Sequence, residues 1–206
     1  MFTMKRLVSV CLVLAALFIV TQPVFAQTSP PTGVSYGDQN IEPWSDTIGG
    51  NVVQAYTEIT VTSPTIITSV SLYLQYYGSD GSQCMYFGLY PDPGTGSPAG
   101  QQLAAATRQA YCLRSGGAWG PAWQTWNLNP SDYMLVEPGT YWLCTLARYT
   151  FGTVYHYSYA DGNDWPYGTS TYFFAAVFET GFPQFFSPTP TSYTEGPYSF
   201  YVTGTV

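Results

Sequence analysis

The chain has 206 residues, of which twelve are acidic and five basic, and its formal net charge is −7 at neutral pH. So few cations cannot neutralise a nucleic-acid backbone or an anionic bilayer, which excludes both as partners. Aromatic residues make up 18% of the sequence, and with the abundant β-branched residues they exclude an intrinsically disordered chain.

The first 26 residues have the three-part pattern of a secretory signal peptide. A basic pair precedes an apolar run from Leu7 to Val20, and Val24 and Ala26 occupy the −3 and −1 positions of the expected cleavage site. The apolar run has about 14 residues, whereas a membrane-spanning helix needs roughly 20. We therefore predict cleavage after Ala26, no membrane insertion of the mature protein, and a secreted, extracellular or cell-surface location.

Residues 27–50 contain several prolines and glycines, which is typical of an extended N-terminal segment or linker. A single domain is expected from 51 to 206. The mature chain would hold three basic residues against twelve acidic ones, a formal charge of −9.

Alternation of apolar and polar residues predicts strands in this domain. Between Ser69 and Tyr76, Val70, Leu72 and Leu74 share one face and the intervening polar residues share the other, as in a half-buried strand. About nine short runs of this kind are expected, near 51–62, 69–76, 83–90, 102–113, 123–128, 139–149, 154–159, 172–178 and 198–206. Gly- and Pro-rich turns separate them, which favours an antiparallel β-sandwich over a barrel or an α/β fold.

Three segments in this region form a recognisable order: 67–74, then 87–92 with its following Gly-Ser-Pro-Ala-Gly turn, then 135–143 with Glu-Pro-Gly-Thr-Tyr-Trp. This order resembles a β-sandwich module found in exported bacterial and archaeal proteins. The similarity covers about 66–147. It implies a jelly-roll-like extracellular module, often part of surface or carbohydrate-associated proteins, and it transfers no catalytic residues.

Three cysteines remain after cleavage, and an exported chain meets oxidising conditions. We predict a disulfide between Cys84 and Cys112, since both lie in strand-like runs separated by one long loop. Closing that loop would stabilise the fold by about 3–4 kcal/mol in the chain-entropy model. Cys144 is left as a buried free thiol or as the partner of an intermolecular bridge, and the sequence leaves this open.

Residues suited to catalysis are few. His156 is the single histidine, it lies in a strand-like run, and no nucleophile motif accompanies it. Glu58 and Glu179 are the acidic residues expected inside strands, and paired carboxylates could serve glycoside hydrolysis. Nothing in the sequence places these two at a common cleft. We therefore predict a protein that is not an enzyme and has no cofactor except calcium.

The calcium prediction rests on one short turn. Asp161, Asn163 and Asp164 surround a glycine there, and their oxygen atoms are the ligands that a hard cation prefers. An ordinary polar turn is the alternative, since the spacing is not that of an EF-hand.

Tryptophans divide into two groups. Trp126 and Trp142 lie inside expected strands and are assigned to packing. Trp119 and Trp165 lie in expected loops, with Tyr167 and Asn163 beside the latter. Exposed aromatic side chains on loops can stack on the apolar faces of sugars while neighbouring polar groups bind hydroxyls. The alternative is that these tryptophans cap the ends of the sandwich.

These features predict an exported, non-catalytic surface protein that binds carbohydrate or acts as an adhesin, with a surface glycan or polysaccharide as partner. A second hypothesis is a structural subunit of a surface layer, matrix or filament. Its exposed final strand, 198–206, and extended N-terminal segment would then pair with copies of itself by strand addition. A secreted glycoside hydrolase is the third.

Overall fold

The computed structural model describes residues 33–41, 44–47, 50–76, 83–113, 119–148, 154–158, 170–194 and 198–206. The predicted signal peptide and its cleavage site lie outside these ranges. No helix of the described residues has the length and apolar character needed to cross a membrane.

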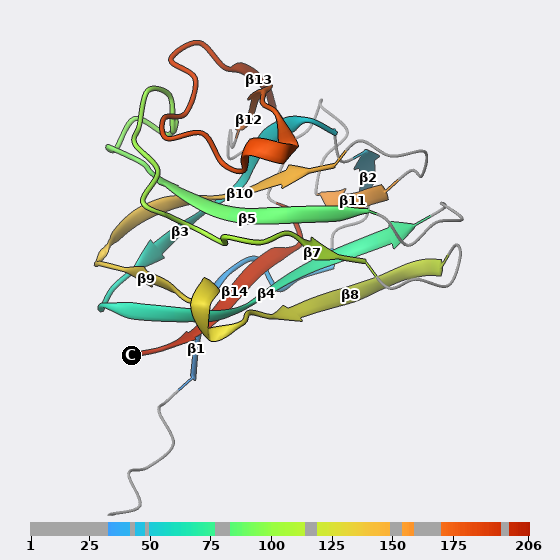
Figure 1. Ribbon diagram of the computed structural model, residues 1–206, viewed down its shortest axis with the longest axis horizontal. Helices are drawn as coiled ribbons and strands as arrows, with labels where there is room; N and C mark the ends of the chain where they lie inside the picture. Colours follow the sequence, from blue (N-terminus) through green and yellow to red (C-terminus); the bar gives the residue numbers. More distant parts are fainter. Residues whose placement is uncertain are drawn as a thin grey trace, which may run out of the picture. The chain divides into compact units, whose positions relative to one another are not determined.

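Two antiparallel sheets pack against each other and confirm the predicted β-sandwich (Figure 1). Sheet A contains seven strands and sheet B contains seven. The strands of sheet A are β1 (Gly33–Gly37), β2 (Trp44–Thr47), β4 (Thr65–Tyr76), β8 (Trp119–Asn127), β9 (Met134–Val136), β11 (Val154–Ser158) and β14 (Phe200–Thr205). The strands of sheet B are β3 (Val52–Val61), β5 (Cys84–Pro91), β6 (Ala105–Ala106), β7 (Tyr111–Cys112), β10 (Gly139–Ala147), β12 (Ser170–Ala175) and β13 (Thr191–Thr194).

Two short 3₁₀ helices complete the described elements, η1 (Pro130–Asp132) and η2 (Phe178–Thr180). The strand count therefore exceeds the nine that were expected. The additional strands are short, with two to five residues each, so each offers at most five residues in which a period-two pattern could be recognised.

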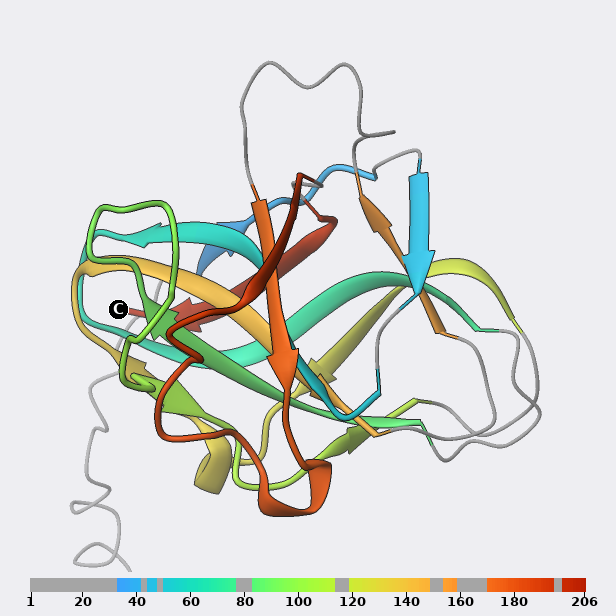
Figure 2. The same cartoon turned by 90° about the horizontal axis from the view of Figure 1, so that it is seen from above.

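Strand β4 is the centre of sheet A. It pairs with β14 and then β11 along one edge, and with β9 and then β8 along the other. β1 lies beyond β14, and β2 lies beyond β11. In sheet B the order is β13-β12-β3-β10-β5-β6, and β7 also pairs with β5. The view from above shows β3, β10 and β5 running side by side (Figure 2).

The main hydrophobic core lies between the two sheets. Alternate side chains of each long strand point inward because successive residues of a strand face opposite sides. The core includes Val70, Leu72 and Leu74 of β4, as the alternation predicted, and they are at most 2% exposed. Opposite side chains from sheet B complete it, among them Tyr56, Phe87, Leu89 and Leu143.

A second core lies on the other face of sheet B. The segment that follows β12 passes over this face, where it contains η2 (Figure 1). Phe186 of this segment is fully buried. The centroid of its ring lies 5.0 Å from that of the Tyr90 ring and 4.7 Å from that of the Phe174 ring. Because β10 is covered on both faces, every residue from Tyr141 to Ala147 is buried.

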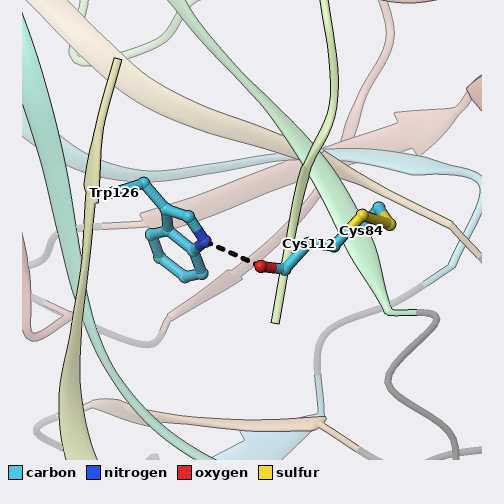
Figure 3. The surroundings of a disulfide bond; sticks show 3 residues. All are labelled: Cys84, Cys112 and Trp126. Carbon is cyan, nitrogen blue, oxygen red and sulfur yellow. Dashed lines mark hydrogen bonds between the residues drawn. A yellow bond between two sulfur atoms is a disulfide. The ribbon is translucent and has the colours of Figure 1, made fainter. Parts of the chain in front are cut away.

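The predicted disulfide joins Cys84 to Cys112. These residues face each other in register on β5 and β7 (Figure 3). Trp126 of β8 donates a hydrogen bond from Nε1 to the Cys112 carbonyl at 3.1 Å. Strand β7 of sheet B, which contains Cys112, is therefore also hydrogen-bonded to β8 of sheet A. Cys144 is free and fully buried, and burial raises the pKa of its thiol, which keeps it neutral.

Two expectations about the ends of the domain require correction. The final strand β14 lies between β1 and β4, so it is not an exposed edge that could join a neighbouring subunit. Segment 27–50 was expected to be an extended N-terminal segment or a linker. Its described part contributes β1 and β2 to sheet A, so it is extended there and does not link separate parts. The prolines and glycines of this segment are atypical of strands, and the strands that pair with β1 and β2 are far away in the sequence. The sequence pattern therefore did not predict β1 and β2.

Candidate functional site

The residues predicted to bind calcium and sugar fall mostly outside the described ranges. This applies to Asp161, Asn163, Asp164, Trp165 and Tyr167, so both sites stay predictions.

Trp119 was expected in a loop but is the first residue of β8, where its backbone pairs with that of Tyr76. The loop placement was wrong because the strand begins before the alternating pattern of Trp123 to Leu128. The predicted contact of Trp119 with sugar stays a prediction. Trp126 and Trp142 pack as predicted, the former against the main core and the latter inside the second.

The two glutamates considered for hydrolysis lie apart. Glu58 is in β3 and lines a hollow of about 460 Å³ together with Asp38. Glu179 is in η2, not in a strand, and lines another hollow of about 300 Å³ beside Arg108. The two carboxylates therefore do not meet across a common cleft.

Glu58 instead contacts Asp92, at the end of β5. Burial, followed by the negative charge of Asp92 and a hydrogen bond with it, raises the pKa of Glu58. A glycoside hydrolase needs its two carboxyl groups at least about 5 Å apart, so that a sugar or water fits between them. A directly hydrogen-bonded pair does not have that geometry. His156 lies in β11, and its backbone pairs with Leu74 and Asp46.

The outward face of sheet A offers a different kind of site. The polar residues of β4 that alternate with its core residues point away from the core, among them Ser71 and Tyr73. The strand register places Trp123 of β8 beside Tyr73. It places Thr125 of β8 and Tyr201 of β14 on either side of Ser71. Side chains from three strands therefore meet on this face.

Three aromatic rings form a cluster on the face, which we call the aromatic cluster: Tyr73, Trp123 and Tyr201. The Trp123 ring centroid lies 5.5 Å from that of Tyr73 and 5.0 Å from that of Tyr201, with interplanar angles of 66° and 67°. Such edge-to-face pairs are each worth about 0.5–1.5 kcal/mol beyond area burial. All three residues remain partly exposed, so the rings are held in place and still reach solvent.

Next to the rings lies a set of small polar side chains, which we call the hydroxyl band: Ser35, Ser69, Ser71, Thr125, Asn127 and Thr203. Ser71 and Thr125 share a hydrogen bond of 2.8 Å between their hydroxyls, and Ser69 and Thr203 also pair. Each hydroxyl carries one proton and two lone pairs. A mutual bond uses one of the two protons. Ser71 is 1% exposed and Ser69 is 8% exposed, so the more exposed partners Thr125 and Thr203 present the remaining proton to water or a ligand.

The described outward positions of β1, β4, β8 and β14 carry no charged side chain. The outward residues include Ser35, Ser69, Ser71, Tyr73, Gln75, Trp123, Thr125, Asn127, Tyr201 and Thr203, and beyond the register shift also Thr205 and Ile66, which is 41% exposed. Rings, hydroxyls and amides without formal charge suit a ligand that presents apolar patches and hydroxyl groups side by side.

Sequence reasoning did not find this site, although part of its signal was visible. The alternation in 69–76 placed the Ser69, Ser71 and Tyr73 side chains on one face. It did not reveal that β8 and β14 flank β4, because strand neighbours depend on pairing between distant segments. Comparisons with protein-family models, curated proteins and solved structures gave no match. The resemblance over 66–147 therefore stays a prediction.

Proposed function

We propose that the protein is an exported, non-catalytic module that binds carbohydrate through the outward face of sheet A. The observation that carries this proposal is the aromatic cluster on a sheet face without charge. Pyranose rings have an apolar C–H face that packs on an aromatic ring, and a few placed polar groups then fix the orientation of the ligand.

The rigidity of the face supports the same proposal. Trp123 contacts rings on two other strands, so its side chain loses little freedom when a ligand binds. A side chain that is ordered before binding costs less affinity than one that must be ordered on binding. The loop predicted around Trp165 and Tyr167 would be a further contact for the same class of ligand.

One observation favours the alternative of a self-assembling subunit. Within the described residues, β8 has a strand partner along one edge only, which is β4. This nine-residue strand contains no charged side chain, whereas natural edge strands are commonly blunted by charges. Pro121 within it blocks one position. Addition of β8 to the same strand of a second copy is the form that strand addition would take, and gel filtration would reveal the resulting assemblies.

The test of carbohydrate binding is Trp123→Ala, with Tyr133→Ala as a matched control. Tyr133 is 44% exposed and does not belong to the aromatic cluster. We expect Trp123→Ala to weaken binding by at least about 2 kcal/mol, roughly thirtyfold, and the control to leave it unchanged. A glycan array followed by titration calorimetry measures both, and thermal unfolding shows that each variant is folded. Unchanged binding by folded Trp123→Ala would refute the proposed site.

A further inference from the structure

We infer that the ligand of this face is a single chain of a neutral glycan, free of carboxylate, sulfate and amine groups. The inference rests on the proposed function and adds the ligand class to it. Three features of the face carry it: its charge, the tilt of its rings and the direction of its hydroxyl band.

Charge excludes anionic glycans. The described arginines belong to the other sheet: Arg108 follows β6 and lines the hollow beside Glu179, and Arg148 follows β10, where its N–H donates to the Cys84 carbonyl. No cation among the described outward residues of sheet A can therefore pair with a carboxylate or sulfate. The chain as a whole is negative, so an anionic polymer would also be repelled at a distance.

Charge on the face does not favour cationic glycans either. Asp38 is the described acidic residue that directly follows β1. Its Oδ1 accepts hydrogen bonds from the Asn40 backbone N–H at 2.9 Å and from Asn40 Nδ2 at 2.8 Å. Asp38 and Glu58 line a hollow with Ser35 at the β1 end of the band, and the other described outward residues carry no carboxylate to pair with an amino sugar.

The tilt of the rings excludes a crystalline polysaccharide surface. A flat surface would have to lie on several rings at once, which requires coplanar rings. The rings of Tyr73 and Tyr201 are instead inclined by 66° and 67° to Trp123, so the Trp123 ring is coplanar with neither of its two neighbours. One sugar ring of a free chain can stack on a single tilted side chain, so a soluble chain fits and a crystal face does not.

The hydroxyl band indicates the direction in which the glycan chain lies across the sheet. The register places Asn127, Ser69, Thr203 and Ser35 in one row, on β8, β4, β14 and β1 in that order. Neighbouring strands are about 4.8 Å apart, so the row spans about 14 Å. We place a short oligosaccharide segment across the strands along this row, with its hydroxyls on the band and one ring against the aromatic cluster.

The first experiment measures affinity for five kinds of glycan: soluble neutral, carboxylated, sulfated and amino polysaccharides, and crystalline cellulose particles. Affinity electrophoresis and pull-down are run at about 0.01 M and about 1 M salt, which brackets weak and strong screening. We expect binding to at least one soluble neutral glycan only, with less than about a twofold change between the two salt concentrations. Electrostatic binding would instead fall steeply with salt.

The second experiment adds a charge to the band with Thr125→Lys, and the matched control is Thr191→Lys. Both threonines are exposed strand residues, and Thr191 lies in β13 of sheet B. We expect Thr125→Lys to gain salt-dependent binding of a carboxylated glycan by about tenfold, and the control to gain less than twofold. Equal gains in both variants would show that the band does not select the ligand.

The outcomes separate the two proposals. Wild-type binding to charged or crystalline glycans alone overturns the ligand class, while loss of that binding in Trp123→Ala still supports the proposed function. Binding to no glycan of any kind overturns the proposed function and the ligand class together. Neutral binding that Trp123→Ala abolishes supports both.

Discussion

At the scale of single residues, Asp132 shows how the fold accommodates a buried carboxylate. It lies in η1 and is 2% exposed. Its Oδ1 accepts the Arg108 backbone N–H at 2.7 Å, and its Oδ2 accepts the Tyr111 hydroxyl at 2.8 Å. The Tyr111 oxygen in turn accepts the Asn129 N–H at 2.9 Å. One carboxylate therefore joins η1 to the segment between β6 and β7.

We predict that Asp132→Asn lowers the free energy of unfolding by about 1–3 kcal/mol at neutral pH. Burial opposes ionisation, but the hydrogen bonds from Tyr111 and from the Arg108 and Gln109 backbone outweigh it and lower the pKa of Asp132. A carboxylate with a lowered pKa stabilises the fold above its unfolded-state pKa near 3.9, and this stabilisation disappears as pH falls through the folded-state value.

Urea unfolding at neutral pH and near pH 3 measures the effect, and exposed Glu137→Gln is the control. The difference in the free energy of unfolding between wild type and Asp132→Asn should be smaller near pH 3 than at neutral pH. A difference of the same size at both pH values would contradict the stabilising role assigned to the charge of Asp132.

Some features of single residues could be predicted from the sequence, such as the disulfide, and others could not, such as the exposure of Trp123. The pair Cys84 and Cys112 could be predicted because the expected removal of residues 1–26 and the strand positions restricted the choice of partners. Trp123 could not be singled out as a surface residue, since nothing in its neighbourhood of the sequence distinguishes it from Trp126. The two lie three positions apart on one strand, and pairing with β4 decides which of them faces the core.

At the scale of elements, β14 contains a tight approach that requires glycine. The register between β14 and β4 shifts between Thr203 and Gly204. A Cβ atom on Gly204 would lie 2.5 Å from the Ile66 carbonyl oxygen and 2.8 Å from Thr65 Cγ2. Because one of these atoms belongs to the backbone, the two strands would have to separate.

We predict that Gly204→Ala destabilises the protein by about 1–3 kcal/mol, as overpacking does. Gly120→Ala in β8 is the matched control, since a Cβ atom there has no neighbour within 4 Å. Thermal unfolding of the two variants compares them directly. Equal stability of both would mean that β4 yields to the added methyl group without cost.

Elements differed in how well the sequence predicted them. The strand 69–76 was found because β4 has a core face and a solvent face. β10 shows no such alternation because both of its faces are buried. Glu179 was assigned to a strand because the preceding residues 172–178 are apolar, yet the strand ends at Ala175 and the residues after it cover sheet B.

At the scale of the whole molecule, two cores share one sheet. β3, β5 and β10 contribute side chains to the main core on one face and to the second core on the other. Disruption of either core therefore acts on the same backbone. The sandwich class was predictable from strand spacing and turns. The second core was not, because it depends on the segment after β12, in which η2 is the one described helix.

We predict that Phe186→Ala costs about 3–5 kcal/mol and that the variant still unfolds in a single transition. The residue is fully buried between two rings of the second core. Near-ultraviolet circular dichroism and tryptophan fluorescence, recorded in the same urea titration, should give coincident curves. Two separated transitions would show that the covering segment unfolds independently of the sandwich.

The position of β14 also has a consequence for folding during synthesis. In the described part of the chain, β1 pairs with β14 alone, and β14 separates it from β4. The earliest described strand therefore has no partner until the latest one has left the ribosome. Such distant pairing slows folding, so we expect β1 to be ordered in sheet A only after synthesis of the chain is nearly complete.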